Sequence, residues 1–290
     1  MNPNHTILIF GATGMIGHTL YSELSKLSSL KVYGTIRNQK NRALLPIEYQ
    51  SNIISNIEIT NVKSVQNVIY DIMPSIIINA VGIVKQLPES NDISKSFSIN
   101  SLWPHQLVGH AKLAGAYVIQ LSSDCVYSGK RGMYLESDTP DPTDIYGQTK
   151  WLGELLEAKT MTIRTSTIGP ELSTHHGLLE WFLSQTDEVS GYERAVYSGI
   201  PTIELARILG HYVFPQIKKF SGIFHISSKP ITKYHLLHLI ATKYHKQVTI
   251  NKVKQPIIDR SLDGGKFSAL TSYQPQEWKT LVNEMYEKDI

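Results

Sequence analysis

Residues 7–17 read ILIFGATGMIG, an apolar run that passes directly into three glycines at three-residue spacing. An apolar run of this kind is typical of a buried strand, and the residues after it have helical spacing. Gly11 lets the strand turn sharply, Gly14 lets the backbone approach a pyrophosphate, and Gly17 permits close packing of the helix. The free amides at the helix start face the phosphate charge. This segment therefore predicts an α/β fold whose first strand–helix turn binds a dinucleotide.

Apolar strand patterns alternate with helical patterns along most of the chain, as they do in folds with a parallel sheet. The predicted strands are Thr6 to Phe10, Lys31 to Ile36, Ser75 to Asn79, Tyr117 to Leu121, Met161 to Ile163 and Gly222 to Ile226. The predicted helices are Met15 to Leu27, Val62 to Ile72, Ser101 to Ala114, Gly147 to Glu157, Gly177 to Gln185, Ile203 to Val213 and Tyr234 to Tyr244.

The fold class that these patterns predict is α/β, with two interleaved parts. We expect a doubly wound parallel-sheet Rossmann domain that binds NADP in residues 1–166, with a returning strand near 222–227. After Gly169 and Pro170 the alternation becomes irregular. Residues 167–290 are therefore predicted to form a smaller α/β substrate-binding lobe.

The composition argues against several classes of protein. Lys and Arg number 28 against 25 Asp and Glu, and no basic run suggests a groove for nucleic acid. The single cysteine, Cys125, excludes an internal disulfide, and the histidines lack acidic partners at a metal-ligand spacing. No stretch approaches the about 18 apolar residues of a membrane span, and Ile7 to Phe10 is too short for a signal segment. We expect a cytoplasmic protein without metal, nucleic-acid or membrane partners.

The residues after the second predicted strand indicate which dinucleotide binds. An acidic side chain there would accept the ribose 2′-hydroxyl group of NAD and repel the 2′-phosphate of NADP. This chain has Arg37 instead, whose guanidinium group can pair with a 2′-phosphate. We therefore predict NADP(H) as the cofactor. A solvated surface arginine is the alternative interpretation of Arg37.

Two further segments carry groups suited to the reduction of a carbonyl. Tyr146 and Lys150 stand four residues apart and share one helix face, where the ammonium group would stabilise a phenolate and orient the nicotinamide ribose. Ser123 and Asp124 follow a strand, at the edge where such sheets bind ligands. Ser123 and Tyr146 would polarise the carbonyl, and Tyr146 would donate the proton. Asp124 would assist this protonation or simply cap the strand.

The glycine turn, the Ser-Ser-Asp strand end and Tyr-x-x-x-Lys together resemble the extended short-chain dehydrogenase/reductase family. Asn79 to Gly82 is similar to the segment that lines the cofactor in that family, Asn100 to its helix-start asparagine, and Arg164 to Pro170 to the entry into its substrate lobe. The candidate cofactor-binding residues are Gly11, Thr13, Gly14, Met15, Ile16, Gly17, Arg37, Glu58, Ile59, Ala80, Val81, Gly82, Asn100, Tyr146 and Lys150.

Within this family, Ser122 to Gly129 and Gly222 to Ser227 are similar to the dTDP-4-dehydrorhamnose reductase branch. That resemblance implies a nucleotide-sugar substrate, and a homodimer is the candidate assembly. The candidate substrate-binding residues are Lys85, Ser123, Asp124, Cys125, Arg194 and Arg260. For Arg260, a surface salt bridge is the alternative role.

Cys125 helps to separate the members of the family. Nucleotide-sugar 4,6-dehydratases carry an acidic pair after the strand-end hydroxyl, because elimination of water needs a carboxylic acid and a carboxylate base. Here Asp124 is followed by Cys125, whose thiol cannot replace the base. The prediction is therefore an NADPH-dependent oxidoreductase that reduces a 4-keto-6-deoxy nucleotide sugar, dTDP- or UDP-linked, in deoxysugar biosynthesis for surface polysaccharide or glycan.

Two alternatives stay open. A nucleotide-sugar epimerase of the same family would carry the same Ser123, Tyr146 and Lys150, although epimerases generally keep NAD bound, which Arg37 disfavours. The regulatory beta subunit of methionine adenosyltransferase resembles the same branch and acts as a binding partner. An intact catalytic set makes a non-catalytic NADP-binding subunit the weaker alternative.

Overall fold

The computed structural model describes residues 5–86 and 88–289. Its largest element is a seven-stranded sheet in the order β11-β6-β5-β4-β1-β2-β3, in which all neighbouring strands are parallel. The strands are β1 His5–Phe10, β2 Leu30–Thr35, β3 Ile53–Ile54, β4 Ile76–Asn79, β5 Tyr117–Leu121, β6 Thr160–Arg164 and β11 Gly222–His225. The sheet confirms the predicted α/β class. The chain order reverses between β1 and β4, which makes that position the topological switch point.

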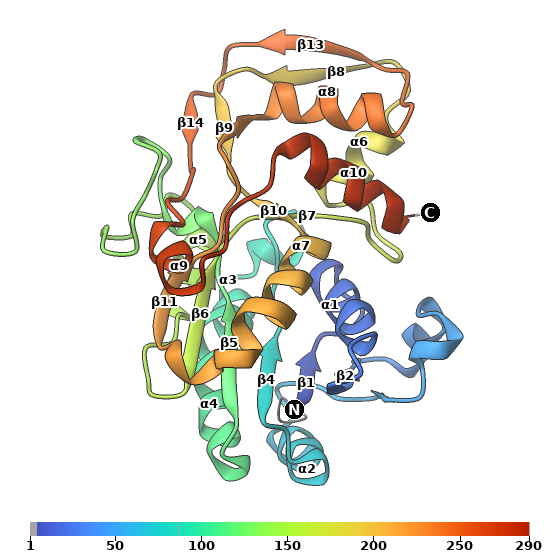
Figure 1. Ribbon diagram of the computed structural model, residues 1–290, viewed down its shortest axis with the longest axis vertical. Helices are drawn as coiled ribbons and strands as arrows, with labels where there is room; N and C mark the ends of the chain where they lie inside the picture. The colour runs from blue at the N-terminus through green and yellow to red at the C-terminus, as the bar shows by residue number, and fades with distance from the viewer. Residues whose placement is uncertain (1–4, 87, 290) are drawn as a thin grey trace.

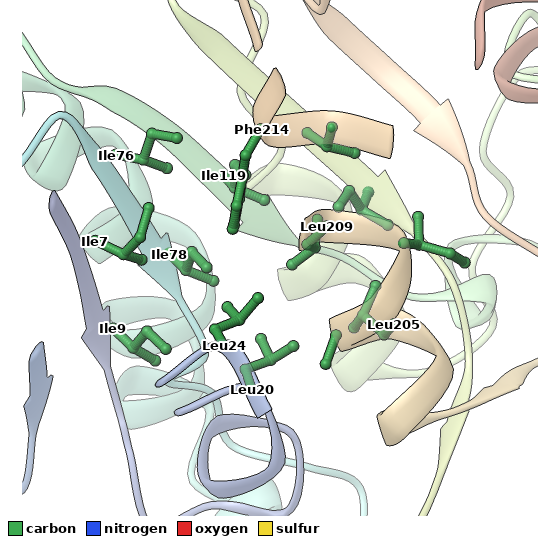
Figure 2. Close-up of a cluster of buried hydrophobic side chains, with 14 of the residues drawn as sticks. Ile7, Ile9, Leu20, Leu24, Ile76, Ile78, Ile119, Leu205, Leu209 and Phe214 are labelled. Atoms are coloured by element: carbon green, nitrogen blue, oxygen red, sulfur yellow. The ribbon is translucent and has the colours of Figure 1, made fainter. Parts of the chain in front are cut away.

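Helices cover both faces of this sheet because alternate residues of each strand point to opposite faces. One face packs against α1 (Met15–Ser25) and α7 (Thr202–Ile208) (Figure 2). This layer includes Ile7, Ile9, Leu20, Leu24, Ile76, Ile78, Ile119, Leu205, Leu209 and Phe214. The other face packs against α2 (Val62–Ile72) and α4 (Trp103–Ala114). This second layer includes Leu8, Phe10, Val65, Ile69, Ile77, Leu107 and Val118. The sheet is therefore doubly wound.

Most residues after β6 form a smaller lobe, which lies above the sheet in Figure 1, toward the carboxyl ends of β1 and β4. Its strands are β7 Thr167–Ile168, β8 Glu188–Tyr192, β9 Ala195–Tyr197, β10 Ile200–Pro201, β12 Ile231–Thr232, β13 Thr249–Val253 and β14 Ile258–Asp259. They pair as β10-β7, β12-β9-β14 and β13-β8. Its helices are α6 Leu178–Ser184, α8 Lys233–Lys243 and α10 Trp278–Asp289, whereas α9 Gly265–Thr271 packs beside β11 of the large sheet (Figure 1). A separate apolar core unites α6, α8 and α10.

The chain returns from the lobe to the sheet. After α7, it continues through a π-helical segment η6 (Leu209–Val213) and a 3₁₀ segment η7 (Phe214–Lys219) into β11, which pairs with β6. Other 3₁₀ turns are η1 Gln39–Leu44, η2 Ile47–Tyr49, η3 Pro88–Asn91 and η5 Asp124–Val126. In the described part of the chain, no helix is long and apolar enough to cross a membrane.

Most predicted helices differ from the structure by a few residues at their ends, and two of them show a structural reason. The helix expected to begin at Ser101 continues from α3 (Ile93–Ser96) through a π-helical segment η4 (Phe97–Leu102) into α4. The helix expected to reach Glu157 is α5, Ile145–Leu152. A Cβ atom on Gly153 would lie 1.9 Å from the carbonyl oxygen of Asn100. Glycine there allows close packing of α5 on η4, and the chain leaves the helix at that point.

Candidate active site

The glycine turn joins β1 to α1 at the switch point of the sheet. Gly11 has a φ of +88°, in the left-handed region that glycine adopts without strain. A Cβ atom on Gly17 would lie 2.0 Å from the Gly11 carbonyl oxygen, so only glycine lets α1 pack this closely. Gly14 is the N-cap of α1, and among residues 5–86 and 88–289 no side chain caps this end. The first amides of α1 therefore remain available to an anion.

The loop that follows β4 lies against this turn. The Ala80 N–H donates a hydrogen bond to Phe10 O at 3.0 Å. A Cβ atom on Gly11 would come within 3.0 Å of Val81 Cγ2, and Gly82 is exposed next to it. The structure thus brings together the following candidate cofactor-binding residues: Gly11, Thr13, Gly14, Met15, Ile16, Gly17, Ala80, Val81 and Gly82.

The ends of β2 and β3 lie beside the same turn. The Ala12 N–H donates to Thr35 O at 2.9 Å, which ties the turn to the last residue of β2. Arg37 follows two residues later and is exposed. Glu58 and Ile59 follow β3, the next strand of the sheet; Glu58 is half-buried and Ile59 is buried. Arg37 is therefore an exposed residue just after the strand end that is bonded to the glycine turn.

Ser123 and Tyr146 meet beyond the end of β5. Ser123 Oγ accepts a hydrogen bond from the Cys125 N–H at 3.0 Å and donates one to Asp124 Oδ1 at 3.1 Å. Tyr146 lies in the first turn of α5 and is close enough to Ser123 for the two side chains to interact. Burial raises the pKa of the Tyr146 phenol above its ordinary value, and the interaction with Ser123 opposes the rise. Two hydroxyl groups and one carboxyl group are therefore neighbours here.

Lys150 is buried one turn further along α5. Its Nζ donates a hydrogen bond to Leu121 O, the last residue of β5, at 2.5 Å. A Cβ atom on Gly82 would lie 3.8 Å from this Nζ, so the ammonium group also adjoins the loop after β4. Burial lowers the pKa of Lys150 to about 8, and the charge of Glu154 opposes that effect. Lys150 Nζ therefore lies between the end of β5 and the loop after β4, which carries candidate cofactor residues.

Asn100 holds this corner of the site together. Its Oδ1 accepts a hydrogen bond from the Ile83 N–H at 2.8 Å. Its Nδ2 donates to Ile83 O at 3.0 Å and to Thr149 Oγ1 at 3.2 Å. These bonds engage both ends of the buried amide. Asn100 therefore joins the loop after β4 to α5 and fixes the helix that carries Tyr146 and Lys150.

Arg260 reaches the same strand end from the smaller lobe. It follows β14, donates from Nε to Tyr127 O at 2.9 Å, and places Nη1 3.5 Å from Cys125 Sγ. Burial raises the pKa of Cys125 to about 12, and the charge of Asp124 adds to the rise. Burial also raises the pKa of Asp124, whereas the charge of Arg260 opposes it. Arg260 therefore brings a positive charge next to Cys125 and Asp124.

Lys85 and Arg194 occupy different places. Lys85 Nζ forms an ion pair with Asp144 Oδ2 at 2.8 Å, and Asp144 caps α5 by accepting from the Gly147 N–H at 2.8 Å. Lys85 therefore stands at the start of α5, the helix that carries Tyr146 and Lys150. Arg194 is exposed between β8 and β9. Within the described residues, no hydrogen bond or ion pair joins its side chain to Asp124 or Tyr146.

One family model matches nearly the whole chain. The model described as RmlD substrate binding domain matches residues 5–290. The chain belongs to this family. Membership of the RmlD substrate binding domain family confirms the branch inferred from the sequence motifs.

Two curated relatives are similar to this RmlD family member. Methionine adenosyltransferase 2 subunit beta of Bos taurus is 30% identical over 152 residues, which cover 52% of this chain and 42% of that protein. The dTDP-4-dehydrorhamnose reductase of Aggregatibacter actinomycetemcomitans is 25% identical over 239 residues, which cover 79% of this chain and 75% of that protein. The match thus spans less than half the length of the beta subunit.

A solved structure shows that the RmlD family member shares its fold with a known protein. The dTDP-4-dehydrorhamnose reductase of Bacillus anthracis in complex with NADP has a TM-score of 0.81 at 19% identity. The likeness covers 98% of this chain and 99% of that one. At this identity, the comparison supports the architecture described above.

Sequence reasoning missed a buried ion pair beneath this RmlD family site. Glu154 accepts hydrogen bonds from Arg164 Nε and Nη2, each at 2.7 Å, and from Ser122 Oγ at 2.7 Å. Arg164 also donates to the Tyr127 hydroxyl at 2.5 Å. These bonds anchor the strand end that carries Ser123. The signal was available, because an arginine at the end of a buried strand requires a charged or polar partner.

Lys233 was also missed. It is the first residue of α8, and its Nζ lies 4.1 Å from the centroid of the Tyr197 ring. Burial lowers the pKa of Lys233 to about 8, and the charges of Asp124 and Cys125 oppose the change. Lys233 is therefore a lysine of the lobe whose ammonium group lies over an aromatic ring.

Proposed function

We propose that this chain is an NADPH-dependent reductase of a 4-keto-6-deoxy nucleotide sugar, dTDP- or UDP-linked, in deoxysugar biosynthesis for surface polysaccharide or glycan. The observation that carries the proposal is the arrangement at the end of β5, where Ser123 bonds to Asp124 at 3.1 Å, Lys150 Nζ bonds to Leu121 O at 2.5 Å, and Tyr146 lies on the same helix as Lys150. Membership of the RmlD substrate binding domain family and the dTDP-4-dehydrorhamnose reductases among its relatives support the same substrate class.

NADP(H) fits the residues around the glycine turn. The tight approach at Gly11 and Gly17 excludes side chains from the turn, and no acidic residue occupies the first turn of α1 among the residues described. Arg37 offers its guanidinium group to a 2′-phosphate from the end of β2. The similar Bacillus anthracis structure is a complex with NADP, which supports the same choice. When bound, this cofactor supplies the hydride for the reaction.

Ser123 and Tyr146 would hold the oxygen of the substrate carbonyl between two hydroxyl donors. As the carbonyl carbon accepts hydride, negative charge develops on that oxygen, and Tyr146 donates its proton to it. The raised pKa of Tyr146 keeps the proton on the phenol until this step. Lys150, with a pKa of about 8, remains mostly charged at neutral pH and stabilises the phenolate that forms. It also adjoins Gly82, where it would orient the cofactor ribose.

Cys125 argues against dehydration. A dehydratase needs a carboxylate base beside its acid, whereas the thiol of Cys125 has a pKa of about 12 and stays neutral. Reduction of a ketone requires no base at this position. Asp124 accepts a hydrogen bond from Ser123; burial raises its pKa, and the charge of Arg260 opposes that rise. Because no base is needed here, Asp124 can assist the protonation step.

The two parts of the chain would bind different ligands. We propose that residues 1–166, with β11, bind the cofactor and that residues 167–290 bind the nucleotide sugar. Arg260 at Cys125 supports this assignment, because it brings positive charge from the second part beside the candidate catalytic groups. Lys85, at the start of α5, would add a substrate contact from the first part. Arg194 would meet a more distant part of the nucleotide.

A non-catalytic, NADP-binding regulatory subunit is the second candidate function. The observation in its favour is the 30% identity to methionine adenosyltransferase 2 subunit beta. The complete set of Ser123, Tyr146 and Lys150 favours catalysis instead. An epimerase shares this set, and Arg37 favours exchangeable NADPH over a permanently held NAD.

The decisive experiment gives the purified protein NADPH and dTDP-4-dehydrorhamnose or its UDP-linked counterpart. We expect NADPH oxidation, followed at 340 nm, that depends on the ketosugar. Conversion of a nucleotide sugar without added NADPH would identify an epimerase or a dehydratase. NADPH binding without any turnover would identify the regulatory-subunit alternative.

A further inference from the structure

A single buried ion pair contacts the chain on both sides of Ser123. Glu154 and Arg164 form this pair, and their side chains are only 4% and 2% exposed. Ser122 Oγ donates to Glu154 Oε1 at 2.7 Å, and Arg164 Nη1 donates to the Tyr127 hydroxyl at 2.5 Å. The residue before Ser123 and a residue shortly after it therefore bind the same pair.

The pair also ties this segment to α5, the helix that carries Tyr146. Glu154 follows the end of α5, and its N–H donates to Trp151 O in the last turn at 3.1 Å. Its carboxylate accepts from Arg164 Nε and Nη2, each at 2.7 Å, and two parallel bonds of this kind fix the relative orientation of the two side chains. A rigid connection therefore runs from α5 through Glu154 to the residues around Ser123.

Two hydrogen bonds of Ser123 lie within its own turn and do not supply this connection. Its Oγ accepts from the Cys125 N–H at 3.0 Å and donates to Asp124 Oδ1 at 3.1 Å. These bonds order the turn but do not tie it to α5. The bond from Ser122 to Glu154 therefore adds a link that the bonds within the turn lack.

Stability alone does not account for such a pair. Burial of two charges costs free energy, and apolar side chains of similar size in place of a buried pair are often neutral or stabilising. A buried network whose bonds are all directed favours one arrangement of the elements that it joins. Here those elements carry Ser123 and Tyr146, the two hydroxyl groups proposed to hold the carbonyl oxygen.

We propose that Ser122 and the Glu154–Arg164 pair are positioning residues, which fix the Ser123 hydroxyl relative to Tyr146. The inference rests on the proposed function and adds residues that act through Ser123 without touching the substrate. A hydroxyl displaced by about 1 Å bonds poorly to the oxygen on which charge develops. The network therefore contributes to turnover more than to the binding of cofactor or substrate.

Ser122→Ala separates the pair from the turn that follows β5. It removes the bond to Glu154 but leaves Glu154 and Arg164 bonded to each other, so no buried charge loses its partner. The bond from Lys150 to Leu121 O also remains. A change in turnover then reports on the single link between Ser122 and the pair.

Thr160→Val is the matched control, at the end of β6 opposite Arg164. It removes a buried hydroxyl that donates to Glu157 O at 2.7 Å. Steady-state kinetics with NADPH and the 4-keto-6-deoxy nucleotide sugar are measured for both changes, each made in the unaltered protein and in Ser123→Ala. Circular dichroism and thermal unfolding check that every variant is folded.

We expect Ser122→Ala to lower kcat about tenfold, with KM for NADPH and for the ketosugar within about twofold. In Ser123→Ala, where no hydroxyl is left to position, the further loss should be less than about twofold. Thr160→Val should leave kcat unchanged. Equal losses from Ser122→Ala in both backgrounds, an equal loss in Thr160→Val, or an unchanged kcat in folded Ser122→Ala would each overturn the inference.

The amide of Cys125 gives a second measurement that needs no turnover. Cys125 is the only cysteine of the chain, so isotope labelling of cysteine yields a single amide signal in an NMR spectrum. Its N–H donates to Ser123 Oγ, and a turn that is held less firmly opens more often. Hydrogen exchange of this amide should be at least about threefold faster in Ser122→Ala and unchanged in Thr160→Val. An unchanged rate in Ser122→Ala would overturn the inference, whatever reaction the protein catalyses.

These outcomes separate the inference from the proposed function. If the unaltered protein reduces the ketosugar but Ser122→Ala costs as much in Ser123→Ala, the positioning role fails and the reductase stands. If the unaltered protein oxidises no NADPH with the ketosugar, the reductase fails. Hydrogen exchange at Cys125 then decides whether Ser122 and the pair hold Ser123 in place.

Discussion

The phenol oxygen of Tyr146 is the single atom on which the proposed proton transfer depends. In Tyr146→Phe, kcat should fall about 10²- to 10⁴-fold, because the group that transfers its proton to the developing alkoxide is lost and Ser123 only donates a hydrogen bond to it. NADPH affinity, measured by fluorescence, should stay within about twofold. Tyr70→Phe is the control, since Tyr70 is 78% exposed on α2. A Tyr146→Phe protein with unaltered kcat would remove Tyr146 from the mechanism.

Arg37 is expected to distinguish the two dinucleotides at the end of β2. Arg37→Asp replaces a phosphate-pairing group by one that repels phosphate and accepts a ribose hydroxyl, so the ratio of kcat/KM for NADPH to that for NADH should fall at least about tenfold. Lys31→Asp makes the same charge change near the opposite end of β2, at another exposed residue. The control should keep the original ratio. If both variants keep it, the 2′-phosphate is recognised elsewhere.

At the scale of elements, the approach of α1 to β1 depends on Gly17. The added Cβ atom in Gly17→Ala would meet the Gly11 carbonyl oxygen at 2.0 Å, so helix and turn must separate. We expect a loss of about 1–3 kcal/mol in the free energy of unfolding and weaker NADPH binding. Gly109→Ala in α4 is the matched control, because its Cβ atom would have no heavy atom within 4 Å. Urea unfolding that ranks the two variants equally would contradict this account.

The elements also differ in how well their sequences predict them. The buried strands of the large sheet were found because their apolar runs are continuous. The two-residue strands β3 and β14 have no pattern of their own, and their pairing partners define them. The helix α10 was missed although Trp278, Leu281, Val282 and Met285 are buried at helical spacing. The apolar pattern of α10 was therefore present in the sequence. The early end of α5, by contrast, depends on the contact of Gly153 with Asn100, which the sequence does not show.

At the scale of the whole molecule, His225 joins the returning strand β11 to the loop after β5. Its Nδ1 contacts Tyr134 O at 3.0 Å, and burial, reinforced by the charge of Arg164, lowers its pKa from 6.5 to about 3. Between these two pH values the unfolded chain binds a proton that the folded chain does not. The contribution of His225 to stability is therefore complete above about pH 6.5 and declines as the pH falls toward about 3.

Replacing this histidine tests the linkage. In His225→Gln, the free energy of unfolding should decline less steeply between pH 6.5 and 4 than in the unaltered protein, whatever its value at neutral pH. His211→Gln, which removes an exposed imidazole from η6, should keep the original slope. Urea denaturation at a series of pH values measures both slopes. Identical slopes for His225→Gln and the unaltered protein would show that His225 does not carry the effect.

The sequence by itself determined the parallel sheet, the glycine turn and the residues proposed for hydride and proton transfer. These features are local: a strand shows as a run of apolar residues, and Gly11 to Gly17 or Tyr146 to Lys150 lie within one or two helical turns. Only the tertiary structure decided that Glu154 pairs with Arg164 and that Arg260 reaches Cys125. Arg260 and Cys125 come from separate elements of two interleaved parts. They are close because the lobe packs over the carboxyl ends of the strands. The spacing of residues along the chain cannot predict that packing.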